Sequence, residues 1–169
     1  VEYESLNTEW KTRGARQAEQ IDVLRKLWSG EVVSFEGRFH RMEKVTIEPP
    51  PVQRPIPIWV GGVSEGAIKR AARQADGWMP ILAPDAQAVE KLALLREEMR
   101  NHGRDPAEFG LEAWLRMNEP DPQRWGAAAD AWRKLGADYV MLYPMFREPR
   151  FEGQIEILKR FRSVAGEQV

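Results

Sequence analysis

The chain has 169 residues, no cysteine, and a formal charge of −1 at pH 7 from 25 basic and 26 acidic residues. This length suits one domain with a full core, and the missing cysteines exclude disulfides, zinc thiolate sites and cysteine nucleophiles. The balanced charge argues against nucleic acid or an anionic membrane as the main partner, because both select a basic surface.

No apolar run in the sequence approaches the ~20 residues of a membrane span, and no signal peptide is visible, which fits a cytoplasmic protein. The sequence starts at Val1 rather than at a methionine. We therefore expect a processed or truncated piece of a longer protein.

The first predicted element is an amphipathic helix over residues 13–29, ended by Gly30. The apolar stripe of this helix consists of Ile21, Leu24, Leu27 and Trp28. A β-hairpin-like insertion is predicted over residues 32–48. The prolines between residues 49 and 57 then form an extended segment that cannot be helical.

Four strand–helix units follow. The predicted strands cover residues 58–61, 77–81, 111–117 and 138–143, and the predicted helices cover residues 64–75, 85–102, 122–135 and 151–163. Such alternation indicates an α/β protein with a parallel sheet and helices packed outside it. Four units are either an open four-stranded layer or half of an eight-unit barrel.

Asp85 and Asp121 are the expected N-caps of the second and third of these helices, and Gly136 is expected to end the third. The apolar residues expected on the packed faces are Val89, Leu92, Leu95 and Met99 on the second helix, Trp125 and Trp132 on the third, and Ile155, Leu158 and Phe161 on the last.

The segment from Ile56 to Ser64 carries the clearest sign of a binding site. It predicts a short buried strand, a turn at Gly61 and Gly62, and a helix with Ser64 as its N-cap. A helix start behind glycines presents free N–H groups and the positive end of the helix dipole, which suits a phosphate or a carboxylate. The alternative is a tight strand-to-helix turn with no ligand.

Other polar and aromatic candidates favour structural roles. His102 is expected to interact with the helix end beside Gly103, and His40 is expected on a surface strand. Neither lies in a ligand-like cluster, so no metal site is expected. For Trp78 a core role and a contact with a ligand ring are equally favoured. Arg147 and Arg150 follow the last strand and are candidates for a phosphate contact, but exposed loop arginines are common and the structural role is favoured.

Several segments in order resemble the C-terminal half of the bacterial luciferase-like monooxygenase family, specifically its branch of coenzyme F420-dependent oxidoreductases. Over residues 13–80 the resemblance lies in specific motifs, whereas over residues 81–169 only the alternation of strands and helices is shared. It is carried by Arg13-Gly14-Ala15-Arg16, Leu27-Trp28-Ser29-Gly30, Val33-Ser34-Phe35-Glu36-Gly37-Arg38-Phe39, Pro50-Pro51-Val52-Gln53-Arg54-Pro55, Trp59-Val60-Gly61-Gly62 and Ala75-Asp76-Gly77-Trp78.

The resemblance implies that residues 1–169 form a single partial (β/α)8 TIM-barrel domain. It also implies a cofactor at the carboxyl ends of the strands, with coenzyme F420 preferred over FMN. The cofactor-binding residues would be Gly61, Gly62, Val63, Ser64 and Trp78. In this family the first strands supply most catalytic side chains, so catalytic residues stay unassigned and the isolated chain is expected to be inactive.

The expected partners are a small-molecule substrate, a flavin-type cofactor and a further copy of the chain, because open sheet edges favour self-association. Two alternatives to an oxidoreductase remain open. One is a non-catalytic half-barrel that self-associates. The other is an α/β module that binds a phosphorylated ligand without redox chemistry.

Overall fold

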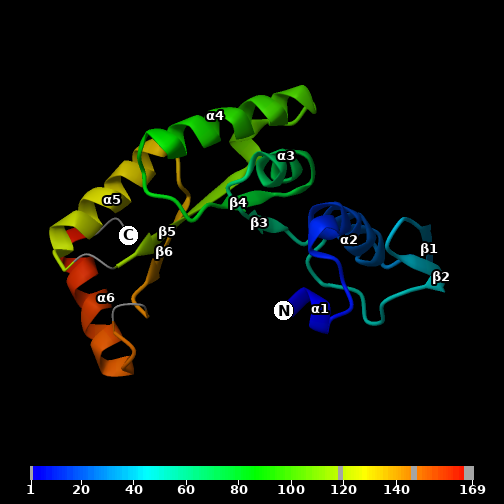
Figure 1. Cartoon of the computed structure of the whole chain (residues 1–169), viewed down its shortest axis with the longest axis horizontal. Coiled ribbons are helices and arrows are strands. Elements are labelled where there is room, and N and C mark those ends of the chain that lie inside the picture. Colours follow the sequence, from blue (N-terminus) through cyan, green and yellow to red (C-terminus); the bar gives the residue numbers. More distant parts are fainter. Residues whose placement is uncertain (1, 118–119, 146–147, 166–169) are drawn as a thin grey trace. The chain divides into compact units, whose positions relative to one another are not determined.

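The computed structural model describes residues 2–117, 120–145 and 148–165 (Figure 1). The chain divides into two compact units, Val1–Ile58 and Trp59–Val169. The expectation of a single partial-barrel domain stays a prediction. Within the described ranges, none of the helices is long and apolar enough to cross a membrane.

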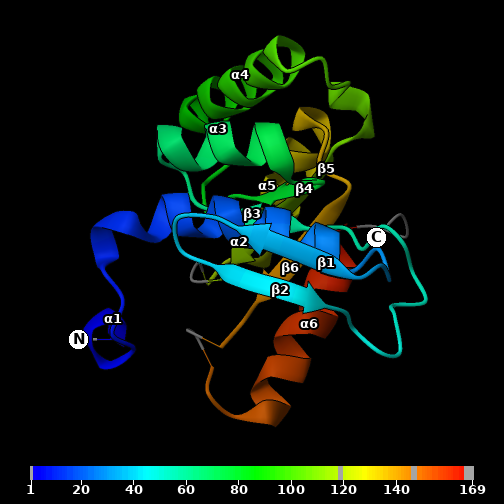
Figure 2. The same ribbon diagram turned by 90° about the vertical axis from the view of Figure 1, so that its right-hand side faces the viewer.

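Over residues 2–58, the first unit contains two helices, a 3₁₀ turn and a two-stranded antiparallel sheet. Its elements are α1 (Glu2–Ser5), η1 (Trp10–Thr12), α2 (Arg13–Leu27), β1 (Val33–Glu36) and β2 (Arg41–Val45). Figure 2 shows β1 and β2 side by side in opposite directions. This antiparallel pair lies within residues 32–48, the range predicted for the β-hairpin-like insertion. Gly30, which was predicted to end the helix, follows α2 and has a φ of 82°.

The apolar stripe predicted for α2 is partly wrong. Ile21 is buried as expected, but Leu24 is 38% exposed and Val23 is buried in its place. Trp28 is half-buried and serves as the C-cap, where its backbone N–H bonds to the carbonyl of Leu24.

One carboxylate of α2 closes the turn between β1 and β2. The side chain of Glu19 accepts hydrogen bonds from the backbone N–H groups of Arg38, Phe39 and His40 at 2.7–2.8 Å. Its Oε1 also lies 2.8 Å from Nδ1 of His40. Hydrogen bonds from three successive backbone N–H groups to one carboxylate are charge-assisted, so they are stronger than hydrogen bonds between neutral groups. His40 therefore has a structural role, in the contact between Glu19 and the turn that leads into β2.

The second unit is a parallel sheet in the order β3-β4-β5-β6, with a helix after each strand. The strands are β3 (Trp59–Gly61), β4 (Gly77–Met79), β5 (Gly110–Arg116) and β6 (Tyr139–Tyr143). The helices are α3 (Glu65–Gln74), α4 (Ala86–Asn101), α5 (Pro122–Leu135) and α6 (Phe151–Ala165), with the 3₁₀ turn η2 (Pro106–Glu108) before β5. The predicted strand–helix alternation is confirmed.

The helix starts and stops follow local sequence chemistry. The side chains of Ser64, Asp85 and Asp121 accept hydrogen bonds from the first turns of α3, α4 and α5. Gly136 ends α5 with a φ of 95°, in the left-handed region that glycine adopts without strain. These caps were all predicted from the sequence.

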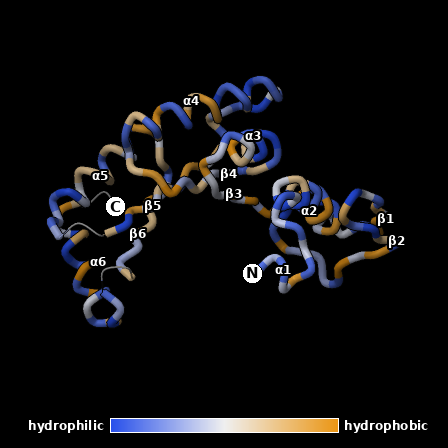
Figure 3. Tube along the Cα trace, in the orientation of Figure 1, coloured by the Kyte–Doolittle hydropathy of each residue, from blue (hydrophilic) through white to orange (hydrophobic). Residues whose placement is uncertain are grey.

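The core of the second unit lies between the sheet and its helices. Alternate strand residues on one face are buried, namely Val60, Trp78, Leu111, Ala113 and Leu115. Figure 1 shows α3, α4 and α5 together on one side of the sheet, and Figure 3 shows hydrophobic and hydrophilic residues alternating along α4. The buried helix residues are Ala67, Ile68, Ala71, Ala72, Ala88, Leu92, Leu95, Met99, Trp125, Gly126, Ala129, Trp132, Ile157 and Phe161.

Three residues predicted to face this core do not. Val89 is 52% exposed, and its neighbour Ala88 is buried instead. Ile155 and Leu158 are each 36% exposed, while Ile157 is buried. The remaining predicted inward residues, Leu92, Leu95 and Met99 of α4 and Phe161 of α6, are buried, so only part of each stripe differs. By contrast, Trp125 and Trp132, seven residues apart on α5, are both buried as predicted.

The other face of the sheet carries Trp59 at the start of β3. A Cβ added to Gly77 would lie 2.3 Å from the Trp59 ring, and one added to Gly110 would lie 2.2 Å from it. The ring therefore fits over the first residues of β4 and β5, in space that two glycines leave open. Tyr139 of β6 meets it edge-on, with ring centroids 5.9 Å apart.

Arg104 holds the far end of α3. Its guanidinium donates to the carbonyls of Ala72 at 2.7 Å and Ala75 at 2.6 Å. These carbonyls have no acceptor role inside the helix, and a cation suits the negative end of its dipole. The segment after α4 thus fixes where α3 ends.

We predict that Glu19→Gln removes a pH-dependent part of the stability of the first unit. Burial alone would raise the pKa of Glu19, but the hydrogen bonds from His40 and from the backbone of the turn outweigh it and hold the pKa below the ordinary 4.5. A lowered native pKa stabilises the fold above the unfolded-state pKa, and this stabilisation is lost as the pH falls through the native value.

The measurement is thermal unfolding at neutral pH and at successively lower pH values, from above to well below the ordinary carboxyl pKa of 4.5. The wild type should lose stability more steeply on acidification than Glu19→Gln, and the variant should be less stable at neutral pH. Glu43→Gln, which removes an exposed carboxylate from β2, is the matched control and should behave as wild type. If the thermal stabilities of wild type and Glu19→Gln depend on pH in parallel, the stabilising role of the Glu19 carboxylate is contradicted.

Candidate functional site

The diglycine turn lies at the carboxyl end of β3, directly before α3. Gly61 is the last residue of β3, Glu65 is the first of α3, and residues 61–66 are all exposed. In parallel α/β sheets, ligands bind outside the carboxyl ends of the strands. The predicted site residues Gly61, Gly62, Val63 and Ser64 are therefore contiguous and open to a ligand.

The two glycines have different structural roles. Gly62 has a φ of 101°, and a Cβ added there would lie 3.0 Å from Cβ of Ala67. A Cβ added to Gly61 would lie 3.6 Å from the carbonyl oxygen of Met79, an ordinary contact. The turn thus requires glycine at position 62 and tolerates a small side chain at position 61.

The start of α3 has the geometry of an anion site. The backbone N–H of Ala67 points to Ser64, whose Oγ is 3.4 Å and whose carbonyl oxygen is 2.9 Å away. The N–H groups of Glu65 and Gly66 come earlier in the helix, where no intrahelical acceptor exists. A Cβ added to Gly66 would meet nothing within 4 Å. The exposed turn therefore has room for a phosphate at the positive end of the α3 dipole.

Trp78 supports this turn from below. Its side chain is completely buried, with a relative exposure of 0%, and its indole Nε1 donates a 2.9 Å hydrogen bond to the carbonyl of Gly62. The bond joins the second residue of β4 to the left-handed residue of the turn. The expected direct contact of Trp78 with a ligand ring stays a prediction, whereas its contact with Gly62 is observed.

The charge at the start of α3 is neutralised locally. The Nζ of Lys69 lies 2.7 Å from Oε1 of Glu65 and 3.4 Å from Oε1 of Glu98. The hydrogen bond from Lys69, followed by its positive charge, lowers the pKa of Glu65, and the same bond raises the pKa of Lys69. The carboxylate of Glu65 is thus occupied by Lys69, which reduces its repulsion of an anion at the turn.

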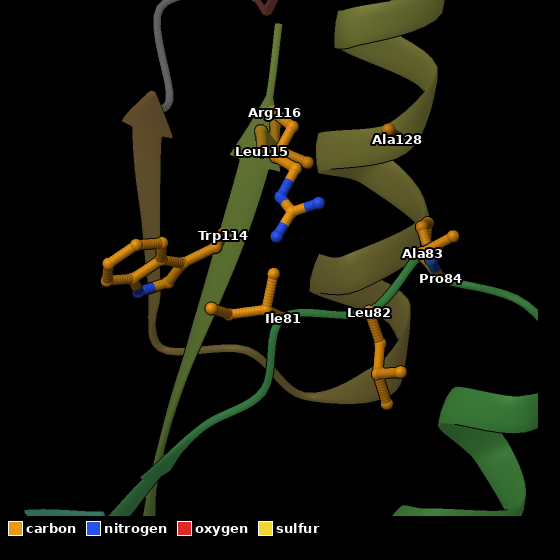
Figure 4. A pocket seen from close by; sticks show the side chains of 8 residues that line it. All are labelled: Ile81, Leu82, Ala83, Pro84, Trp114, Leu115, Arg116 and Ala128. Carbon is orange, nitrogen blue, oxygen red and sulfur yellow. The ribbon is translucent and has the colours of Figure 1, made fainter. Parts of the chain in front are cut away.

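A second feature at the same edge of the sheet was not predicted. A cavity of about 260 Å³ opens at the carboxyl ends of β4 and β5 (Figure 4), lined by Ile81, Leu82, Ala83, Pro84, Trp114, Leu115, Arg116 and Ala128. The sequence signal was the alternation Glu112, Trp114, Arg116 along β5, which places three polar or aromatic side chains on one face of a strand.

The other candidates fall in structural positions. The Nδ1 of His102 lies 2.8 Å from the carbonyl oxygen of Glu98, as expected for a histidine at a helix end. Arg150 pairs with Glu148 at 3.0 Å, and Arg147 lies outside the described residues. In the part of the chain that the structure describes, no three His, Asp or Glu side chains gather as a metal site would require.

Comparison with known proteins gives a consistent result. The model of the luciferase-like monooxygenase family matches residues 1–164. The F420-dependent hydroxymycolic acid dehydrogenase of Mycobacterium tuberculosis is 33% identical over 124 residues, which are 73% of this chain and 34% of that protein. The F420-dependent glucose-6-phosphate dehydrogenase of Nakamurella multipartita is 37% identical over 98 residues, which are 57% and 29% of the two chains.

Among solved structures, the monooxygenase RslO1 from Streptomyces bottropensis has a TM-score of 0.57 and 24% identity, over 94% of this chain and 48% of that one. At this identity the likeness is one of fold. The chain spans about a third of the length of the two curated relatives. The prediction of parallel βα units that form part of a TIM barrel is confirmed. The chain belongs to the luciferase-like monooxygenase family.

Proposed function

We propose that the chain is part of a coenzyme F420-dependent oxidoreductase and that the turn of residues 61–64, together with the start of α3 behind it, holds the phosphate of the cofactor. The observation that carries the proposal is the exposed diglycine turn at the carboxyl end of β3, which opens onto the start of α3. Helix starts behind glycines are general sites for phosphate groups. FMN, which also carries a phosphate, is the alternative cofactor.

The preference for F420 rests on two relatives whose names include this dependence, the hydroxymycolic acid and glucose-6-phosphate dehydrogenases. Their substrates differ from each other, so neither substrate is transferred to this chain. A bound deazaflavin supplies the hydride acceptor or donor itself, while the protein supplies position and electrostatics.

The residues of this chain would form a preorganised phosphate-binding site. The N–H groups of Glu65 and Gly66 would donate to the phosphate oxygens, while Gly61 and Gly62 let the anion approach the backbone. The Ser64 hydroxyl is already engaged with Ala67, so its role is to cap the helix. Trp78 would act through Gly62, by fixing the conformation of the turn.

The four parallel strands seen in the described part of the chain are half of the eight that close a TIM barrel. We therefore propose that the 169-residue chain by itself binds only the phosphate end of the cofactor and does not turn over substrate. No catalytic residue is assigned within it.

We predict that Gly62→Ala weakens F420 binding and that Gly61→Ala does not. Alanine at a φ of 101° is strained by roughly 1–2 kcal/mol and deforms the turn, so Kd should rise by about tenfold. At Gly61 the added methyl group meets only an ordinary contact, so Kd should stay within about twofold of wild type.

The measurement is a titration of the purified chain with F420, followed by deazaflavin fluorescence, and a parallel titration with FMN. Circular dichroism checks that both variants keep the fold. If neither cofactor binds the wild type, the proposal fails. If Gly61→Ala and Gly62→Ala weaken cofactor binding equally, the proposal that this turn binds the phosphate is contradicted.

We also predict that Trp78→Phe weakens F420 binding, because it removes the hydrogen bond that holds the Gly62 carbonyl. The phenyl ring keeps most of the packing volume, but the Gly62 carbonyl loses its 2.9 Å donor. Because Gly62 is exposed, its carbonyl can bond to water instead, and the lost hydrogen bond costs roughly 0.5–1.5 kcal/mol. Thermal stability should therefore fall, and Kd should rise several-fold.

Trp132→Phe is the matched control, because Trp132 is equally buried on α5 but makes no bond to the turn. It should lower stability while leaving the Kd for F420 unchanged. Equal effects of the two substitutions on Kd would mean that general loosening of the core explains both.

We propose further that the chain forms a homo-oligomer. Within the described residues, β3 and β6 are the two edges of the parallel sheet, and its outer face carries the exposed side chains of Tyr139 and Met141. Open edges and exposed apolar surface favour association. Size-exclusion chromatography with light scattering at two concentrations should give a mass above 19.5 kDa. A monomer at both concentrations would contradict this proposal.

A further inference from the structure

The cavity at the carboxyl ends of β4 and β5 is chemically two-sided. Most of its lining is apolar and comes from the segment between β4 and α4, from β5 and from α5. The side chains of Ile81, Leu82 and Pro84 form one wall, and Leu115 and Ala128 form another. A surface of this kind accepts a hydrocarbon chain, because covering it removes apolar area from water.

One cation lies among these apolar groups. Figure 4 shows the guanidinium of Arg116 directed back along β5 toward Ile81, so that its charge lies beside the apolar walls. Among the eight lining residues, Arg116 is the charged one. A planar guanidinium matches the two oxygens of a carboxylate and binds them with two parallel hydrogen bonds.

The orientation of Trp114 is fixed by its neighbours on the sheet. Its indole Nε1 donates a 3.0 Å hydrogen bond to Oε1 of Glu112, two residues earlier on β5. Its ring lies 5.7 Å from the ring of Tyr143 on β6, at an interplanar angle of 40°. Trp114 therefore forms a firm aromatic rim to the cavity, because the bond and the ring contact both limit its rotation.

We propose that this cavity is the substrate subsite and that it takes an aliphatic carboxylate, with the hydrocarbon chain against Ile81 and Ala128 and the carboxylate on Arg116. The proposal rests on the proposed function, since it names the substrate class of that oxidoreductase. The volume of about 260 Å³ equals roughly nine water-sized volumes of ~30 Å³, which suits a chain the size of octanoate.

The test is a titration of the purified chain with octanoate, followed by isothermal calorimetry without any cofactor. Octylamine, with the same chain and the opposite charge, and acetate, with the same head and almost no chain, are the comparison ligands. Octanoate should bind saturably and at least about tenfold more tightly than either, because only octanoate satisfies both parts of the cavity.

Two substitutions examine the two parts separately. Arg116→Gln should weaken octanoate binding by about tenfold and leave octylamine binding unchanged or improved. Ala128→Leu should weaken both ligands, because the larger side chain fills the apolar wall. Arg100→Gln removes an exposed arginine of α4 outside the cavity and should bind octanoate as wild type does.

The proposal is overturned if octanoate does not bind, or if Arg116→Gln and Arg100→Gln give the same affinity. This result is independent of the cofactor titration. If octanoate binds with the expected pattern and F420 and FMN do not bind, the cavity is a carboxylate site, but the oxidoreductase proposal fails and the role of the cavity as its substrate subsite fails with it. If a cofactor binds and octanoate does not, the substrate class is wrong and the oxidoreductase proposal stands.

Discussion

The hydrogen bond from the Trp78 indole to the Gly62 carbonyl is the constraint on which the candidate site depends. Trp78 is anchored in the buried layer between sheet and helices, and Gly62 lies on the exposed turn. One 2.9 Å bond thus ties the exposed turn to the buried core of the unit. Because Gly62 has a positive φ that disfavours other residues, the turn holds a conformation that a side chain at this position would strain.

The helix behind the turn is held at both ends, which fixes the direction of its dipole. At its start, Ser64 caps the N–H of Ala67, and at its end Arg104 binds the carbonyls of Ala72 and Ala75. Between them, small buried residues such as Ala71 let the helix lie close to the sheet. An anion site made of backbone N–H groups works only if those groups are preorganised. The contacts of α3 provide that preorganisation.

Much of the fold could be predicted because its signals are local. Ser64, Asp85 and Asp121 cap helices that begin at the next residue, and alternation along β5 follows from strand geometry. The inward faces of helices were less predictable. Val89 and Ala88 are both apolar, and only the packing of α4 against its neighbours decides that the smaller one is buried.

The contacts that sequence reasoning missed join residues far apart in the chain. Glu19 binds a turn about twenty residues later, and Arg104 reaches back about thirty residues to α3. Neither pairing has a spacing rule, since each depends on where the elements pack. The cavity was missed for the same reason, because its walls come from a loop after β4 and from residues of β5 and α5. The diglycine turn was found because strand, glycines and cap are adjacent in sequence.

The alternation along β5 explains how one face of this strand carries both the contact with Trp59 and part of the cavity lining. Gly110 leaves room for the Trp59 ring at the amino end, Glu112 orients the next aromatic residue, and Arg116 reaches the cavity at the carboxyl end. These residues share one face, and Leu111, Ala113 and Leu115 on the other face are buried against the helices. A slip of one residue in the pairing of β5 would exchange the two faces, burying a glutamate and an arginine. The cost of burying those charges therefore specifies the register of the strand and, with it, the position of the cavity lining.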